Sequence, residues 1–578
     1  MAGAAGAPGS DRMRGSALDL SPAPAGRLAR PLLPSIERSV RALGGRPLTL
    51  ATGAAAALPV LVSSVRAVRV GWEPTDDKAI IATRAYDVLT RHTPLVGQYS
   101  MAGRVTGHPA HDLGPMLYWL LAVPVRLGAP AAVAVTMGAV NTAAVVAVVA
   151  LARSRGGRAL MFMTAVAVAL MCRSLAAETF HDIWNPAAAL FPFLLLIFLC
   201  WSLACGRHRL LPLTVLVASF VVQAHLSYLA PTAGLVAIGL AGVVATRRRE
   251  LVAVGLLSLA VAAACWVPAG VDQATEHPGN LTSVVATATA QRATLGARVG
   301  AHAVVRAVGF RPWWLVVPGT RWDRKHDVRA TPSATRVDTA IAVLAALALV
   351  GAVGLVRRRI DLAAAALIGF ALCAGLFAVA AETPRQPVLA ATLGYTLWWG
   401  SQAGTWVWLL LAWSAWLAAG ALIARHVSSG KHRLRAAGLA SVAGLAVAAL
   451  AGSAVAAGEE PDQHVALYRP IAAIGERLDT AIRPGTVVRL DGRLDVRTQP
   501  FKAAVRFELA GRGIRVLSRG AAARNGDWYE LDHRRYDVIL TLTDRPRRPR
   551  GEHASLLIHE RFVELGARHA VFVWMAHR

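Results

Sequence analysis

Charged residues are scarce in this 578-residue chain. They make up 16% of the sequence, whereas hydrophobic residues make up 55%. Charged residues make up roughly a quarter of an ordinary soluble domain, so this composition excludes an ordinary soluble enzyme. Repeated apolar runs of about 18 residues or more instead predict a polytopic α-helical membrane protein.

Acidic residues are fewer than basic ones, with 34 Asp and Glu against 61 Lys and Arg, which gives a formal net charge of +27. Such an excess of positive charge can favour nucleic-acid binding. Much of it, however, lies in short clusters between apolar runs, as the topology determinants of membrane proteins do. We therefore expect membrane lipids, and no nucleic acid, among the partners.

Cysteine is also rare, with five residues and no CxxC pair. All five lie in or beside apolar runs: Cys172, Cys200, Cys205, Cys265 and Cys373. This placement argues against a disulfide framework and against a metal site, and it favours buried apolar side chains. The N-terminus lacks the apolar segment of a signal peptide, so residues 1–46 are predicted to be a disordered cytoplasmic tail.

Basic clusters follow every second apolar run, and this alternation predicts the topology. Clusters around 153–158, 207–209, 247–249, 357–359 and 425–435 are placed inside by the positive-inside rule. About eleven spans are predicted, over residues 47–69, 130–152, 159–176, 187–205, 210–226, 229–246, 251–270, 337–356, 361–381, 402–424 and 436–457. The protein is then a multi-pass plasma-membrane protein with a cytoplasmic N-terminus. Its transmembrane domain, 47–457, carries outer loops at 70–129 and 271–336.

The chain changes character after residue 457. Apolar runs shorten to strand length at 486–490, 536–541, 555–558 and 570–574, and helical patterns fall at about 463–482 and 498–511. This alternation predicts a small extracytoplasmic α/β domain over 458–578. It contains no glycine-rich phosphate loop and no Ser/His/Asp set, so we expect a supporting role.

Two adjacent carboxylates, Asp76 and Asp77, follow the first predicted span. Acidic residues where a chain leaves the bilayer suggest a functional site. We predict a helix over 78–90 and a second over 114–124, which lies in the outer interface with Tyr118 and Trp119 at headgroup depth. An alternative interpretation of the acidic pair is a solvated first helical turn, where acids favour the helix dipole.

The order of these segments resembles the GT-C superfamily of membrane glycosyltransferases, especially the protein O-mannosyltransferase and aminoarabinose transferase branch. The run 72–86, containing Asp76-Asp77-Lys78, is similar to the first-loop motif of that branch. Segment 108–119 is similar to its interfacial helix with a proline and aromatic residues. Residues 183–186 resemble the Leu-Asp-Pro that opens its fourth span, with Asn185 in place of the Asp. The resemblance covers about residues 47–246.

The resemblance implies a reaction at the outer face of the membrane. A sugar would move from a polyprenyl-phosphate donor to an envelope acceptor, which is a glycan, lipid or protein hydroxyl, with no cofactor besides the donor substrate. Asp76 would be the general base, and Asp77 would orient Asp76 or the acceptor. Two carboxylates this close repel each other, so one pKa is expected to rise toward the working range.

Polar side chains that face the same compartment are the candidate substrate-binding residues. They are Lys78, Arg84, Arg104, His108, His111, Tyr118, His181, Asp182, Asn185 and His225. Charge-assisted hydrogen bonds from the cations would stabilise a leaving phosphate. The alternatives are headgroup contacts for the cations, helix capping for Asp182 and Asn185, and an interfacial position for His225.

Two other functions stay open at this point. A transporter or flippase of a lipid-linked glycan would place charges near the midpoints of its spans, and these spans are nearly free of charge there. A non-catalytic membrane scaffold would need none of the outer acids.

Overall fold

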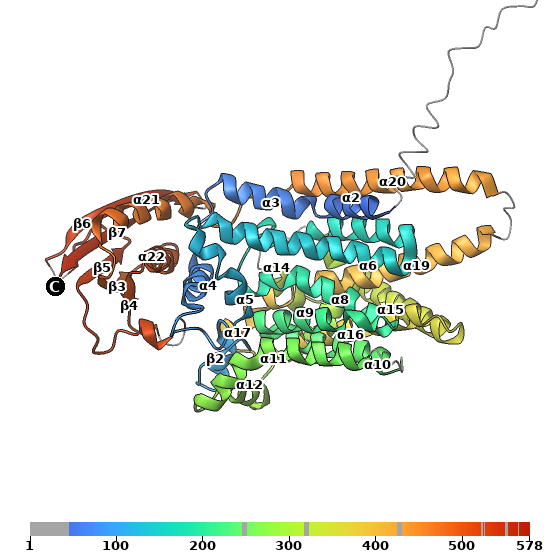
Figure 1. Ribbon diagram of the computed structural model, residues 1–578, viewed down its shortest axis with the longest axis horizontal. Helices are drawn as coiled ribbons and strands as arrows, with labels where there is room; N and C mark the ends of the chain where they lie inside the picture. The colour runs from blue at the N-terminus through green and yellow to red at the C-terminus, as the bar shows by residue number, and fades with distance from the viewer. Residues whose placement is uncertain are drawn as a thin grey trace, which may run out of the picture. The chain divides into compact units, whose positions relative to one another are not determined.

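The computed structural model describes residues 45–245, 251–316, 323–424, 430–521, 524, 526–549, 553–564 and 566–578. Nearly all of the predicted tail, 1–46, lies outside these residues. The long apolar helices run roughly parallel to one another (Figure 1).

Every one of the predicted spans coincides with a helix. In the described residues, eight helices are long and apolar enough to cross a membrane, or nine if one bent pair counts as a single span. The bent pair is α2 (Arg46–Ala56) with α3 (Leu58–Arg69), which meet at an angle of 59°. The eight contain α6 (Ala131–Cys172), α8 (Leu190–Ala204), α10 (Leu229–Val244), α11 (Leu251–Thr275), α15 (Ala334–Val356), α16 (Ile360–Ala381), α19 (Gly400–Ala424) and α20 (Gly430–Ala457). The predicted span 210–226 corresponds to a shorter apolar helix, α9 (Leu211–Ala224).

Helix α6 contains two of the predicted spans. A continuous helix of its 42 residues would be about 63 Å long, twice the thickness of a hydrocarbon core. Gly156 and Gly157 have non-helical backbone angles, and Gly157 has φ 67°. Glycine tolerates this left-handed region because it has no Cβ. The two halves of α6 are therefore separate helices, as the basic cluster between them predicts.

Aromatic side chains fill the core of the helical bundle around α8. Trp201 on α8 contacts Trp406 and Trp413 on α19 edge to face, with ring centroids 5.4 and 5.7 Å apart. Phe198 packs against Trp406 at 5.1 Å. Such pairs add to the free energy gained by burying the rings. Helix α8 is hydrophobic on all sides because other helices surround it.

The loops 70–130, 173–184 and 225–228 are called the first, second and third outer loops, after the topology that the sequence predicts. The first of them folds into short elements. They are α4 (Asp76–Asp87), β1 (Tyr99–Ser100), η1 (Met101–Val105), β2 (Ala110–His111), α5 (Met116–Leu121) and η2 (Pro124–Leu127). Both predicted helices are therefore present. The expected headgroup position of Tyr118 is wrong, because α5 packs on α4 and Tyr118 is only 2% exposed within the protein core. Trp119 is half-buried.

Short helices also occupy the other loops at the same end of the bundle. They are η3 (Ala177–Phe180), α7 (Asn185–Ala188), η5 (Leu226–Tyr228), α12 (Asn280–Thr289), α13 (Ala297–Val308), η6 (Trp313–Leu315), α14 (Asp323–Arg329), α17 (Pro387–Ala390) and α18 (Leu393–Thr396). One further short helix, η4 (His208–Leu210), precedes α9. Two of the basic loops contact each other, since Arg207 donates to the Ser154 carbonyl at 3.4 Å.

The C-terminal region is a small α/β domain, as predicted. Its elements are α21 (Val465–Ala481), β3 (Val487–Arg493), α22 (Pro500–Gly511), β4 (Arg515–Leu517), η7 (Asp527–Tyr529), β5 (Val538–Thr543), β6 (Ser555–Glu564) and β7 (Ala567–His577). The sheet order is β4-β3-β5-β7-β6 (Figure 1). Strand β3 is parallel to β4 and β5, and β7 is antiparallel to β5 and β6. The three-residue β4 was not predicted, because so short a strand has no readable alternation.

Candidate active site

Asp76 and Asp77 begin α4, directly after the turn that follows α3. Asp76 is exposed and has φ 46°, while Asp77 is half-buried. The backbone N–H groups of Lys78 and Ala79 donate to the Thr75 carbonyl at 3.0 and 3.2 Å and close the turn. A left-handed backbone at a residue other than glycine costs about 1–3 kcal/mol and persists only where the surroundings hold it. The protein therefore fixes Asp76 in an unusual conformation.

The surroundings of this turn raise the pKa values of its three carboxyl groups, by different amounts. Although Asp76 is exposed, the surrounding protein partly desolvates its carboxyl group. This desolvation and the neighbouring Asp77 raise the pKa of Asp76 to about 6, against the opposing charges of Lys78 and Arg524. Burial also raises the pKa of Asp77, although Arg524 and hydrogen bonds from Trp184 and Gln98 act to lower it. Burial, with a smaller effect of Glu508, raises the pKa of Glu73 to about 9. At neutral pH Asp76 is thus an ionised, accessible carboxylate, whereas Glu73 is protonated.

Lys78 is buried among acids. Its Nζ lies 3.3 Å from Asp182 Oδ2 and 3.9 Å from Glu178 Oε1, and both partners come from the second outer loop. Two buried carboxylates beside one buried cation form an ion network that holds α4 against this loop. The ammonium group predicted to contact a phosphate is therefore already paired with protein carboxylates.

Arg84 ties α4 to the C-terminal domain. Its Nη1 donates to Asp87 Oδ2 at 2.6 Å, and Asp87 Oδ1 accepts a hydrogen bond from Tyr529 at 2.8 Å. Gly526 approaches the same guanidinium group: a Cβ there would lie 3.1 Å from Arg84 Nη1. Arg84 thus contacts protein on two sides in the part of the chain that the structure describes.

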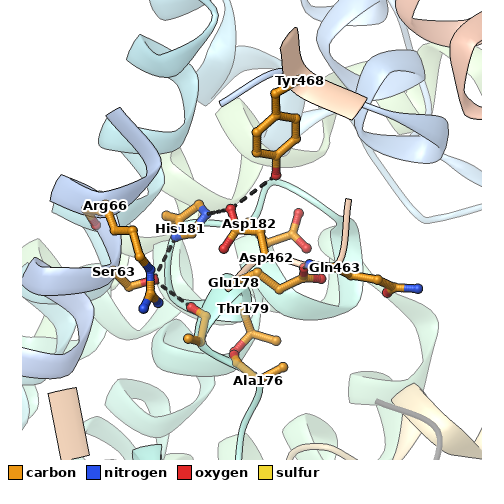
Figure 2. Close-up of polar contacts among 12 residues, drawn as sticks. Ser63, Arg66, Ala176, Glu178, Thr179, His181, Asp182, Asp462, Gln463 and Tyr468 are labelled. Atoms are coloured by element: carbon orange, nitrogen blue, oxygen red, sulfur yellow. Dashed lines mark hydrogen bonds and ion pairs between the residues drawn. The ribbon is translucent and has the colours of Figure 1, made fainter. Parts of the chain in front are cut away.

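The second outer loop places its polar residues in the interior. His181 is fully buried between Ser63 and Asp462 (Figure 2). Asp182 accepts the backbone N–H of Trp184 at 2.8 Å in an Asx turn before α7, and no side chain caps the start of that helix. Asn185 donates to Asp112 Oδ2 at 2.7 Å.

Asp112 is a buried carboxyl group that we did not select from the sequence. It is 2% exposed and also accepts the backbone N–H of Leu226 at 3.0 Å. Burial raises its pKa well above the usual range, against the hydrogen bonds from Asn185 and Leu226. Asp112 thereby joins the first three outer loops. An acidic residue inside the apolar segment before Gly114-Pro115 was the signal available for it.

Arg104 and His108 are exposed side chains beside an open pocket. The pocket has a volume of about 430 Å³ and is lined by Tyr99, Gly103, Arg104, Gly107, His108, Pro109 and Gln386. His111 packs edge-on against the Tyr99 ring at 5.8 Å. Tyr118 donates to Gln98 at 3.3 Å, and Gln98 is also bonded to Asp77. Gln98 is hydrogen-bonded to Asp77, and the next residue, Tyr99, lines the pocket. The pocket therefore lies close to the acidic pair.

The C-terminal domain contributes two charged residues that sequence reasoning missed. The positive charge of Arg524 acts on both Asp76 and Asp77, and the negative charge of Glu564 acts on Asp76. The Arg524 guanidinium also lies 5.9 Å from the centre of the Tyr99 ring. The domain expected only to support the protein therefore reaches the acidic pair.

His225 lies half-buried at the end of α9. Its Nδ1 accepts the backbone N–H of Ser227 at 3.2 Å, and its ring meets the edge of Tyr395 at 5.8 Å. Burial lowers the pKa of His225 to about 4, so the ring is neutral at physiological pH. It can line a polar cavity but cannot supply positive charge for a phosphate.

Among the described residues, no group of three or more His, Cys, Asp or Glu side chains is arranged to hold a metal ion. The predicted outer residues nevertheless gather at one end of the helical bundle. The first, second and third outer loops meet at Asp112, and the C-terminal domain joins them at Asp87 and Asp462. This arrangement combines an accessible carboxylate, that of Asp76, with neighbouring positive charges.

Compared with known proteins, the chain matches no family model and no curated protein sequence. Among solved structures, it is similar to the crystal structure of ArnT from Cupriavidus metallidurans bound to undecaprenyl phosphate. The two chains are 12% identical, the alignment covers 89% of this chain and 96% of that chain, and the TM-score is 0.46.

Proposed function

We propose that this protein is a glycosyltransferase that moves a sugar from a polyprenyl-phosphate donor to a hydroxyl group at the outer face of the plasma membrane. The observation that carries the proposal is the accessible Asp76 carboxylate, whose pKa burial and Asp77 raise to about 6, at the polar end of an apolar helical bundle. A general base works best when its pKa lies near the operating pH. The acceptor is a glycan, lipid or protein hydroxyl of the cell envelope.

In the proposed reaction Asp76 takes the proton of the acceptor hydroxyl. The acceptor oxygen forms a bond to the anomeric carbon while the bond from that carbon to the phosphate oxygen breaks. The polyprenyl phosphate leaves with the electron pair of that bond, so negative charge grows on the leaving oxygen. Fixed cations near that oxygen stabilise the transition state.

The candidates for this charge stabilisation are Arg104, His108 and Arg524. The first two border the 430 Å³ pocket, and Arg524 faces Tyr99, which lines the same pocket. Asp77 is fixed by hydrogen bonds from Trp184 and Gln98 and would keep the pKa of Asp76 raised. The isoprenoid chain would lie along the lipid-facing apolar surfaces of the helices.

A transporter is less consistent with the placement of charge. Within the described spans, acidic and basic residues lie near helix ends or at the Gly156-Gly157 break: Asp272 is near the end of α11, and Asp361 is the second residue of α16. Transport through the bundle would require polar groups near the midpoints of the spans.

We expect sugar transfer to rise with pH and to reach half its maximum near pH 6, because only ionised Asp76 can accept a proton. Substituting Asp77→Asn should move this midpoint to lower pH, since it removes the second-largest cause of the raised pKa. The measurement is the initial rate of transfer by purified protein in lipid vesicles between pH 4.5 and 8. An identical profile in the variant, or a rate independent of pH, would contradict the role of Asp76.

We also expect Arg104→Gln to raise the KM for the donor by about 10- to 100-fold, the effect of losing one charged hydrogen bond to phosphate. The exposed Arg298 on α13 is a matched control, because Arg298→Gln removes an equal charge away from the pocket. The measurement is the dependence of the transfer rate on donor concentration. Equal KM values for the two variants would remove Arg104 from the donor site.

A further inference from the structure

Three arginines gather around one tryptophan where the first outer loop meets the C-terminal domain. Arg515 begins β4, and its Cζ lies 3.4 Å from the centre of the Trp528 ring. Arg91 follows α4, and its Cζ lies 5.6 Å from the centre of the same ring. Arg534 Nη1 and Arg515 Nη2 both donate to the Trp528 carbonyl, at 2.8 and 3.0 Å. We call Arg91, Arg515 and Arg534 the arginine cluster.

The positive charge of the cluster is not balanced by acids. Burial, and the charges of Arg534 and Arg91, lower the pKa of Arg515. In the part of the chain that the structure describes, none of the three arginines forms an ion pair with a carboxylate. Of the acids nearest in the chain, Asp87 already has other partners, and Asp527 is exposed and forms no ion pair. Like charges this close repel one another, so a bound anion would stabilise the cluster.

The loop that carries Arg91 lies at a surface of the bilayer. Helix α6, whose first half is a predicted span, begins at Ala131, and the end of a membrane-crossing helix lies at a membrane surface. Arg126, shortly before this start, donates to the carbonyl groups of Tyr86 and Val88 at 2.6 and 2.8 Å. The C-terminal end of α4 is therefore held at the level where α6 enters the bilayer, and Arg91 follows directly.

Leu89, between α4 and Arg91, has a conformation and an exposure that contacts within the protein do not explain. It has φ 65°, a left-handed backbone that is strained for leucine, and its side chain is 91% exposed. Val123 and Leu127, on either side of Arg126 in the chain, are 69% and 67% exposed. Large apolar side chains exposed together beside arginines mark a membrane-binding surface. At the start of a span, the bilayer is the partner that covers them.

We propose that the arginine cluster binds the phosphate group of an anionic phospholipid, while Leu89 enters the apolar edge of the bilayer beside it. Guanidinium groups form paired, charge-assisted hydrogen bonds with phosphate oxygens, and interfacial arginines are attracted to anionic lipids. The site is shared between Arg91 of the first outer loop and two arginines of the C-terminal domain. A bound lipid therefore links that domain to the bilayer. This proposal goes beyond the proposed function and does not depend on Asp76.

Amide hydrogen exchange of the full-length protein tests the site. The protein is reconstituted in phosphatidylcholine vesicles that contain an increasing fraction of phosphatidylglycerol. The informative amides are those of Tyr529 and Glu530, which directly follow Trp528 and donate to the carbonyl groups of Gly526 and Asp527. We expect their exchange to slow by about fivefold or more as the phosphatidylglycerol fraction rises, because a bound lipid stabilises the conformation that binds it.

Arg91→Gln combined with Arg534→Gln removes two charges of the cluster and keeps Arg515, which packs on the indole ring. We expect this double variant to need about 25-fold more phosphatidylglycerol for the same slowing, or about fivefold for each arginine. The exposed Arg561 and Arg568 provide the matched control, because β6 and β7 lie at the other end of the sheet from β4. Arg561→Gln combined with Arg568→Gln should respond like the wild-type protein.

Leu89→Asn separates the apolar contact from the backbone conformation, since asparagine adopts the left-handed region more readily than leucine. The fold should remain intact, and about fivefold more phosphatidylglycerol should be needed. If the double variant does not fold, Arg91→Gln alone, at an exposed position, should show its own fivefold effect, roughly.

A wild-type protein whose exchange ignores phosphatidylglycerol, or arginine variants that respond like the wild-type protein, would overturn the proposal. An unchanged response of Leu89→Asn would refute the insertion of Leu89. Inorganic phosphate added to vesicles of phosphatidylcholine alone distinguishes a lipid from a soluble anion. Equal slowing by inorganic phosphate would show that the cluster binds a soluble anion and that the lipid assignment is wrong.

Discussion

Asp76→Asn is expected to lower sugar transfer by about 10²- to 10⁴-fold, the usual contribution of a general base. Asparagine has nearly the same shape as aspartate but cannot take up the proton of the acceptor hydroxyl. Since Asp76 is exposed and has no hydrogen-bond partner for its carboxylate among the described residues, the substitution should leave the fold intact. The measurement is the rate of transfer by membranes containing equal amounts of each protein.

The control for this substitution is Asp527→Asn, which removes an exposed carboxylate from the C-terminal domain. It should leave the rate of transfer unchanged. A rate within about threefold of the wild-type rate for Asp76→Asn would exclude general-base catalysis by this residue.

Lys78→Met is expected to lower the free energy of unfolding by about 3–5 kcal/mol, the typical effect of breaking a buried ion pair. The substitution leaves the carboxylates of Glu178 and Asp182 buried without their shared cation. It also removes the contact that joins α4 to the second outer loop, so transfer should fall as well. The measurement is the midpoint of thermal unfolding in detergent, together with the rate of transfer.

The half-exposed Lys502 on α22 is the matched control, and Lys502→Met should change the free energy of unfolding by less than about 1 kcal/mol. An unchanged unfolding midpoint for Lys78→Met, combined with a higher KM for the donor, would contradict the structural role. That result would return Lys78 to the phosphate-binding role predicted from the sequence.

The fold was largely predictable because its main determinants are local in the sequence. Apolar runs between basic clusters located the helices, and the Arg-Gly-Gly-Arg sequence at 155–158 marked the break between the two halves of α6. Except for β4, the strands of the C-terminal domain were predicted from runs of β-branched and apolar residues. Tyr118 was misplaced because its burial depends on α4 packing over α5, which hydropathy alone does not show.

The site was predictable only where its residues are neighbours in the sequence. Asp76 and Asp77 could be selected from the sequence because they are adjacent acidic residues directly after an apolar run. The partner of His181 is Asp462, 281 positions away, and Arg524 reaches the acidic pair from the C-terminal domain. No local pattern relates such residues. Lys78 was therefore predicted to be available for a phosphate, although the Glu178 and Asp182 carboxylates surround it. The C-terminal domain was predicted to have only a supporting role, although Arg524 acts on the acidic pair.

The most direct measurement of the central claim compares lipid-linked sugars and envelope glycans, by mass spectrometry, in cells with the wild-type protein, with Asp76→Asn and without the protein. We expect one polyprenyl-phosphate sugar to accumulate, and one envelope glycan to disappear, both in cells that lack the protein and in cells that carry the variant. Identical lipid-linked sugars and glycans in all three strains would contradict a glycosyltransferase built around Asp76.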